Sequence, residues 1–234
     1  MRNKEIYRVI KIEGRNIPVR IRKNTRARRM ILRIDNNING AVVTLPSWTS
    51  EREALLMVQE KSDWVLTKLD NMPTKIFFES GVQIPFLGEY HIVYHDPNQK
   101  EVVKKGENEI RLGGREEHLS RRLGDWLRKE AKIIIQPKAI EMAKKLNGKI
   151  GRISIRDTKS RWGSCAASGN LSFCWRLILT PEWVLNYVIA HEVSHLRHMN
   201  HGSEFWQTVA DFNVRVDAAR VWLSKNAEQL HRYG

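Results

Sequence analysis

Short runs rich in hydrophobic residues alternate with turns along the first half of the chain, and such runs are typical of β-strands. The runs are 6–12, 17–23, 28–34, 41–46, 82–94 and 109–114. Short turns separate the first four, including the turn over 36–40, so they predict two hairpins. Ser50 and Glu53 form a capping-box pattern that predicts a helix over about 51–70. We therefore expect a β-rich N-terminal region, residues 1–114, with one helix.

From residue 115 the hydrophobic period changes to that of helices. Residues 115–147 predict a long helix that Pro137 kinks or divides, because proline removes a backbone donor and crowds the preceding turn. Residues 152–157 and 171–179 return to the strand pattern, and every odd position of the second segment is apolar. We expect this second region, residues 115–234, to carry the chemistry.

A second helix in this region is apolar nearly all round, which indicates that it is buried. Thr180 supplies a hydroxyl N-cap and Pro181 a favourable first position, so the helix should occupy about 183–198. Polar side chains inside a buried helix need partners, because an unsatisfied buried polar group is costly. Those of this helix include His191, Glu192 and His195.

The polar residues of the helix form the pattern H-E-x-x-H. His191 and His195 lie one turn apart, so both imidazoles leave the same face. In this arrangement two histidines hold zinc and the glutamate acts on an attacking water. A catalytic zinc site takes three protein ligands and keeps one position open. The sequence therefore predicts one zinc ion per chain and a third ligand downstream.

His201 is the expected third ligand. His198 lies about 10 Å along the helix from His191, too far for imidazoles on one stripe to converge on one ion. His201 can converge only if the helix ends first, and we expect Asn200 and Gly202 to permit a left-handed turn there. Ser203 would then cap a new helix.

Two roles at the site are open at this level. Glu192 is the candidate general base, with a structural carboxylate as the alternative. Glu204 competes with His201 as a downstream ligand. Tyr187, one turn before His191, is a candidate for stabilising the oxyanion, although a core position explains it as well.

The composition indicates a globular protein: 41% of the 234 residues are hydrophobic and 28% are charged. We find no signal-peptide pattern and no run long enough to span a membrane, so we expect a cytoplasmic protein that does not enter membranes. Cys165 and Cys174 should be reduced thiols.

The net charge of +14 is concentrated in two segments, 20–33 and 121–161. The first contains seven Lys/Arg and no acid, and the second thirteen Lys/Arg and four acids. Both are either solvated faces or a footprint for nucleic acid or another polyanion. The candidate nucleic-acid contacts are Arg22, Arg26, Arg28 and Arg29.

Four motifs together resemble the YgjP-like metallopeptidases, a family related to the SprT-like and WLM zinc metalloproteases. They are SRWGSC (160–165), WRLI (175–178), YVIAHEVSH (187–195) and NHGSEFW (200–206). The resemblance implies an α+β, zincin-like domain whose active-site helix follows an antiparallel hairpin. It implies zinc on His191, His195 and His201, with Glu192 as catalytic base.

In zincins the strand before the active-site helix usually pairs with an extended substrate. The resemblance thus casts residues 171–178 as a substrate edge, with Ser172, Cys174 and Arg176 as candidate substrate contacts.

Three functions compete. The first is a zinc-dependent peptidase acting on a peptide or protein substrate. The second is a zinc-dependent hydrolase of nucleoside phosphates, because activated water attacks phosphorus as well as carbon. The third is a nucleic-acid-associated protease or binding module.

Overall fold

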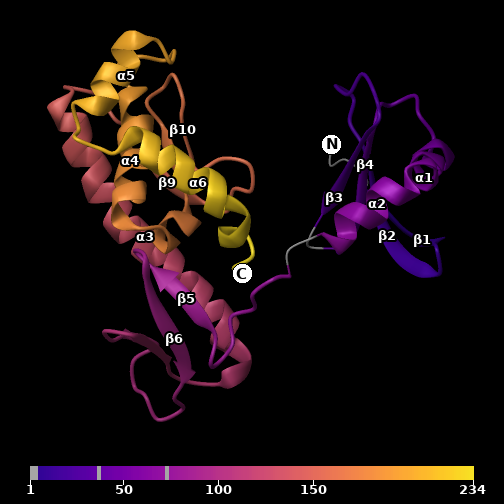
Figure 1. Ribbon diagram of the computed structural model, residues 1–234, viewed down its shortest axis with the longest axis horizontal. Coiled ribbons are helices and arrows are strands. Elements are labelled where there is room, and N and C mark those ends of the chain that lie inside the picture. The colour runs from indigo at the N-terminus through magenta and orange to yellow at the C-terminus, as the bar shows by residue number, and fades with distance from the viewer. Residues whose placement is uncertain (1–4, 36–37, 72–73) are drawn as a thin grey trace. The chain divides into compact units, whose positions relative to one another are not determined.

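The structure is a computed structural model that describes residues 5–35, 38–71 and 74–234 (Figure 1). The chain divides into two compact units, Met1–Pro73 and Thr74–Gly234. The division falls well before the boundary expected between residues 114 and 115. The reason is that strands near residues 83–112 contribute Ile84 and Ile110 to the same core as the helices of the second unit.

The first unit contains a four-stranded sheet in the order β1-β2-β4-β3. Its strands are β1 (Glu5–Ile12), β2 (Arg15–Lys23), β3 (Ile31–Asp35) and β4 (Gly40–Leu45). Both predicted hairpins are confirmed, because β1 pairs antiparallel with β2 and β3 with β4. The parallel pairing of β2 with β4 joins the two hairpins. The turn expected over 36–40 lies partly outside the described residues.

Two helices, α1 (Glu51–Glu60) and α2 (Ser62–Asp70), cover one face of this sheet. The capping box is confirmed: Ser50 Oγ accepts from Glu53 N at 3.2 Å, and Glu53 Oε2 accepts from Ser50 N at 2.8 Å. The single helix expected over 51–70 is interrupted at Lys61. The interruption lets both helices bury apolar residues, such as Val58 and Val65, in one core.

The second unit begins with another four-stranded sheet, in the order β5-β6-β8-β7. The strands are β5 (Gln83–Phe86), β6 (Glu89–His95), β7 (Val103–Lys105) and β8 (Glu109–Leu112). A short 3₁₀ helix, η1 (Glu116–His118), leads into α3 (Leu119–Lys145). Pro137 does not divide α3, and a buried apolar stripe that includes Ile135 and Ala139 runs past it on both sides.

A three-stranded sheet follows, in the order β10-β11-β9. Its strands are β9 (Ile153–Arg156), β10 (Gly163–Cys165) and β11 (Leu171–Cys174). The remaining elements are η2 (Trp175–Leu179), α4 (Glu182–Ser194), α5 (Ser203–Ala210) and α6 (Val216–Leu230). An active-site helix thus follows the antiparallel β10–β11 hairpin, and the α+β prediction is confirmed.

The strand expected over 171–179 is wrong in its second half, which forms the 3₁₀ helix η2. All five residues of η2 are buried. The alternation of apolar and polar residues over 171–179 therefore does not produce one buried face and one exposed face in this part. Arg176 turns inward, forms an ion pair with Asp157, and donates to the Tyr233 carbonyl oxygen from Nη2 at 3.0 Å. The 3₁₀ conformation thus places this buried guanidinium where its nitrogens have partners.

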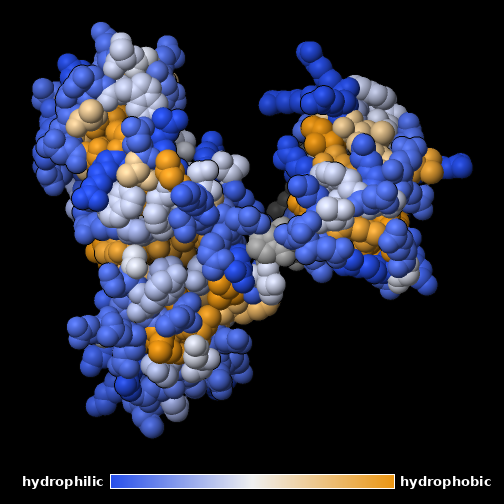
Figure 2. Space-filling view, in the orientation of Figure 1, coloured by the Kyte–Doolittle hydropathy of each residue, from blue (hydrophilic) through white to orange (hydrophobic). Residues whose placement is uncertain are grey.

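The surface seen from one side is mostly hydrophilic, with smaller hydrophobic areas between (Figure 2). None of the helices in the described part of the chain is long and apolar enough to cross a membrane. Cys165 and Cys174 are free thiols, as expected.

Candidate metal centre

Helix α4 carries the first histidines of the site. It is buried on nearly every side, as the sequence predicts, because it packs against α3, α5 and α6. Its start differs from the expectation: the Thr180 hydroxyl donates to the Leu177 carbonyl oxygen at 2.8 Å and does not cap the helix. Thr180 instead closes η2, so that η2 and α4 are joined by a tight turn.

His191, His195 and His201 come together at the end of α4. One ring nitrogen from each lies within 4.8 Å of the others. The Nε2 atoms of His191 and His201 are 3.1 Å apart. Ligand distances of about 2.1 Å in a tetrahedral zinc site place neighbouring nitrogens roughly 3.4 Å apart, so this separation is close to what zinc requires.

The chain returns to the cluster by a route different from the one expected. Helix α4 ends at Ser194, and one further helical turn brings His198 N to the Ser194 carbonyl oxygen at 3.0 Å. Neither Asn200 nor Gly202 adopts a left-handed conformation, and Gly202 has φ of −75°. Ser203 does not cap α5 with its side chain. A bent loop in which neither Asn200 nor Gly202 is left-handed therefore carries His201 back.

His195 is oriented by a main-chain group. Its Nδ1 lies 3.0 Å from the carbonyl oxygen of His198. In the tautomer with the proton on Nδ1, Nδ1–H donates a hydrogen bond to this carbonyl oxygen, and Nε2 is the unprotonated nitrogen that can bind a metal. The carbonyl of His198, and not its imidazole, thus belongs to the site.

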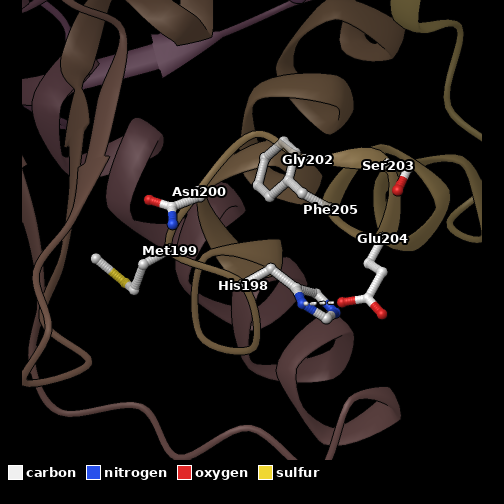
Figure 3. A pocket seen from close by; sticks show the side chains of 7 residues that line it. All are labelled: His198, Met199, Asn200, Gly202, Ser203, Glu204 and Phe205. Atoms are coloured by element: carbon white, nitrogen blue, oxygen red, sulfur yellow. Dashed lines mark ion pairs between the residues drawn. The ribbon is translucent and has the colours of Figure 1, made fainter.

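The side chain of His198 points away from the cluster. Its Nδ1 lies 3.6 Å from Glu204 Oε2, and both residues line a shallow pocket (Figure 3). Glu204 is 84% exposed in its side chain and is not a member of the histidine cluster. Of the two downstream candidates, the geometry therefore brings His201, and not Glu204, to His191 and His195.

Phe205 and Trp206, which the sequence analysis did not single out, support the imidazoles. The buried Phe205 ring lies 5.0 Å from His191, 4.6 Å from His195 and 4.7 Å from His201, centroid to centroid. Trp206 lies 5.8 Å from His191 and 5.7 Å from His201. The only sequence signal was the aromatic pair at the start of α5, which is equally typical of core packing.

Burial sets the electrostatics of the site. Together with the neighbouring His195 and His201, it lowers the pKa of His191 to about 4, so this imidazole is neutral at neutral pH. Burial also raises the pKa of Glu192 to about 7, against the opposing influence of Arg161. The Nδ1 atom of His191 is buried and has no hydrogen-bond partner among the described residues.

Strand β10 lies against Glu192. A Cβ atom built on Gly163 would be only 2.5 Å from Glu192 Cγ and 2.6 Å from its Oε1. Burial, and then the charge of Glu192, raise the pKa of the Cys165 thiol. A glycine at position 163 is therefore required for the strand to approach the carboxylate so closely.

The edge strands of the three-stranded sheet are β10 and β9, and β10 is the one that lies against Glu192, which corrects the assignment of residues 171–178 as a substrate edge. β11 is the central strand and is hydrogen-bonded on both sides. Cys174 and Arg176 are buried, and Cys174 Sγ contacts the Thr158 carbonyl oxygen. Of the three expected substrate contacts, only Ser172 is partly exposed.

The unpaired backbone groups of β10 follow from its register. Cys174 N donates to the Trp162 carbonyl oxygen at 2.8 Å, and Ala166 N donates to that of Asn170 at 2.9 Å. Alternation along an antiparallel pair then makes Ser164 the hydrogen-bonded residue between them. The N–H and C=O groups of Gly163 and Cys165 point away from β11.

The model of the YgjP-like metallopeptidase domain family matches residues 28–226 of the chain. The chain belongs to the YgjP-like metallopeptidase family. It is therefore a metal-dependent peptidase, and the family assignment expected from the four motifs is confirmed. The match covers most of the first unit as well as the second.

One solved structure is similar to this YgjP-like chain, the metallopeptidase zymogen abylysin of Pyrococcus abyssi. The two are 18% identical, and the alignment covers 43% of this chain and 98% of abylysin, with a TM-score of 0.36. No curated protein matches the chain.

Tyr187 is buried, and its ring centroid lies 6.0 Å from that of His191. Burial raises the pKa of its hydroxyl.

The remaining expected site residues are Arg22, Arg26, Arg28 and Arg29. They all lie in the first unit, on β2 and in the loop that follows it.

Proposed function

We propose that this YgjP-like protein is a zinc-dependent peptidase in which His191, His195 and His201 hold one zinc ion and Glu192 is the general base. The observation that carries the proposal is the convergence of three imidazole nitrogens within 4.8 Å, next to a buried carboxylate. His191 and Glu192 lie on α4 and His195 is its C-cap residue in helical conformation, so the helix fixes the relative positions of these three residues.

The residues fit zinc by the chemistry of their donors. Three imidazole nitrogens suit zinc, while magnesium and calcium prefer oxygen ligands. His191 is neutral, as a ligand must be, and His195 is oriented by the His198 carbonyl. A zinc ion held there supplies a Lewis acid that polarises the scissile carbonyl and makes water more acidic.

Glu192 moves the protons of the reaction. Its carboxylate accepts a proton from the attacking water, and the carboxylic acid then donates a proton to the leaving amine as the peptide bond breaks. Packing against Gly163 holds the carboxylate in place. The reaction consumes one water and yields one carboxylic acid and one amine.

A substrate strand would pair with the free edge of β10. The outward N–H and C=O groups of Gly163 and Cys165 offer the hydrogen bonds that an added strand requires. Because Gly163 touches Glu192, a peptide on this edge would pass beside the carboxylate. This replaces β11 with β10 as the strand that binds substrate.

A pocket of about 400 Å³ lies beyond the end of β10 and could receive a substrate side chain. It is lined by residues that flank the strand and by residues near the metal centre, including Ala166, Gly169, His195 and Leu196. Its wall also contains Lys149 and Arg197, whose positive charges favour an acidic side chain.

The test is a comparison of zinc-loaded protein on parallel panels of peptides and nucleoside triphosphates, with Glu192→Gln as the control. We expect hydrolysis of peptides that is lost in the variant. Glu192-dependent hydrolysis confined to the nucleotide panel would replace the peptidase proposal with the phosphate-hydrolase alternative.

A further inference from the structure

The first unit has a strongly uneven charge that the peptidase chemistry does not use. Its described residues 5–50, which form the sheet and its loops, contain ten Lys/Arg and three Asp/Glu. Residues 51–71, which form α1 and α2, contain three Lys/Arg and five Asp/Glu. The helices cover one face of the sheet, so the positive charge is left on the opposite face and in the loops.

Two loops meet at one end of this sheet. β2 and β4 are parallel, so both end there, and Asn24 N donates to the Leu45 carbonyl oxygen at 2.8 Å. Lys23 Nζ lies 3.3 Å from the carbonyl oxygen of Ser47. The loop after β2 therefore lies beside the loop after β4. We call this region the basic end, defined by Lys23, Arg26, Arg28, Arg29 and Trp48.

Trp48 is 72% exposed, the largest exposed fraction among the large hydrophobic residues of the described chain. Tryptophan normally stabilises a fold by burying its large indole ring, and an exposed ring such as that of Trp48 makes little of this contribution. The ammonium group of Lys23 lies at the carbonyl oxygen of Ser47, the residue before Trp48. Proteins that bind single-stranded nucleic acids combine an exposed aromatic ring, on which a base stacks, with nearby positive charges that contact the phosphates.

Among the described residues, no acidic side chain forms an ion pair with the cations of the basic end. On the helix-covered side, Arg8 pairs with Glu51 and Arg15 with Asp70, both at 2.6 Å. Arg26, Arg28 and Arg29, by contrast, are exposed and form no ion pair with an acidic residue of the described chain. Such a cluster repels itself, and a bound polyanion would relieve the repulsion.

The loop is shaped so that these arginines project. Asn24 Oδ1 accepts from Arg26 N at 2.9 Å, and the Asn24 carbonyl oxygen accepts from Ala27 N at 3.0 Å. These bonds form a local turn of the type that asparagine stabilises. The arginines are thus presented from an ordered backbone, which lowers the entropy that binding would cost.

The open face of the sheet continues the basic end. Arg22 Nε donates to Thr44 Oγ1 at 2.9 Å, which leaves its terminal nitrogens available. Arg33, on β3, is exposed and unpaired within the described chain. Tyr7 lies on the same face, opposite Arg20, and is 58% exposed. A second aromatic ring is therefore available along the same surface.

We propose that the first unit binds single-stranded nucleic acid, with phosphates on Arg26, Arg28 and Arg29 and a base stacked on Trp48. Unpaired bases expose the ring faces that an indole can stack on, while bases within a duplex do not. The contacts involve backbone and ring faces, so binding has little sequence preference.

The second basic segment, 121–161, belongs to the second unit. Some of its cations are paired, for example Arg121 with Asp125 at 3.3 Å and Lys138 with Glu182 at 2.8 Å. Lys145 pairs with Glu141 at 2.9 Å.

The test uses the full chain and a labelled oligothymidylate of twenty nucleotides, with binding followed by fluorescence anisotropy across a salt series. Replacing Arg26, Arg28 and Arg29 with Gln should weaken binding and reduce the log–log salt slope by about 2, because each single-strand phosphate contributes roughly 0.7. The matched control replaces the exposed Lys100, Lys104 and Lys225 of the second unit with Gln, which removes the same charge. It should leave the slope nearly unchanged.

Trp48→Ala should weaken binding about tenfold, and Trp48→Phe should retain most of the affinity, because stacking needs an aromatic ring. Glu192→Gln should bind the oligonucleotide like the wild type, so the outcome is separate from that of the peptidase proposal. Equal losses in the two charge variants would overturn the inference. So would tighter binding to duplex DNA of the same length or to phosphatidylserine vesicles, since either result would assign another partner to the surface.

Discussion

The carbonyl oxygen of His198 lies 3.0 Å from Nδ1 of His195, while the His198 imidazole turns away toward Glu204. One residue thus contributes to the metal centre through its main chain alone. A side-chain substitution at 198 should leave this contact intact. The relationship separates His198 from His201, whose ring nitrogen itself lies in the cluster.

We therefore expect His201→Ala to weaken zinc binding on the order of 100-fold or more, since a direct ligand matters at least as much as the groups that orient ligands. His198→Ala should bind zinc nearly as well as the wild type. Metal content by mass spectrometry and competition with a chelator measure both. Retention of zinc by His201→Ala, with its loss from His198→Ala, would reverse the assignment.

Gly163→Ala tests the packing of β10 on Glu192. The added methyl group would lie 2.5 Å from Glu192 Cγ, so the carboxylate or the strand must shift. We expect kcat to fall by roughly 10- to 100-fold, part of what a general base contributes, while zinc content is unchanged. Gly202→Ala is the control, because a Cβ there meets no atom within 4 Å. Comparable kcat values for the two variants would contradict the role of Gly163.

Asp157→Asn tests the ion pair with the buried Arg176. Burial alone would raise the pKa of Asp157, but the hydrogen bond and charge of Arg176 hold it below its ordinary value of 3.8. We expect the variant to lose about 1–2 kcal/mol at pH 7. This is less than the 3–5 kcal/mol of a fully buried pair, because the Asp157 side chain is 49% exposed.

The pH dependence follows from the direction of that pKa shift. The pKa of Asp157 is lower in the folded protein than its value near 3.8 in the unfolded chain. The ion pair therefore contributes its full stability above the unfolded pKa, and this contribution is lost as the pH falls through the folded pKa. The stability difference between wild type and Asp157→Asn should be constant from pH 6 to 8 and shrink below about pH 4. Urea unfolding measures it, and Asp125→Asn, which loses only exposed ion pairs, should change little. A difference that persists unchanged at pH 3 would exclude the ion pair as its origin.

The sequence predicted those parts of the fold that depend on interactions between residues close together in the chain. The hairpins, the capping box at Ser50 and the face shared by His191 and His195 depend on residues close together in sequence. The choice of β10 over β11 as the free edge could not be predicted, because it depends on the pairing of β11 with β9. The same holds for η2, where Arg176 turns inward to reach Tyr233, distant in sequence.

Phe205 provides the last test, because it touches all three histidine rings without being able to bind a metal. Phe205→Leu keeps the position apolar but removes the flat surface against which the imidazoles pack. We expect zinc affinity to fall about tenfold, as it does when groups that orient ligands are changed, and the metal-free protein to lose about 1–2 kcal/mol of stability. Phe78→Leu is the matched control, since Phe78 is also buried but contacts Trp175 and no histidine ring in the described chain. It should lose similar stability and keep its zinc affinity. Equal zinc affinities in the two variants would mean that the histidines hold their geometry without the aromatic support, and that α4 with the returning loop is sufficient to build the site.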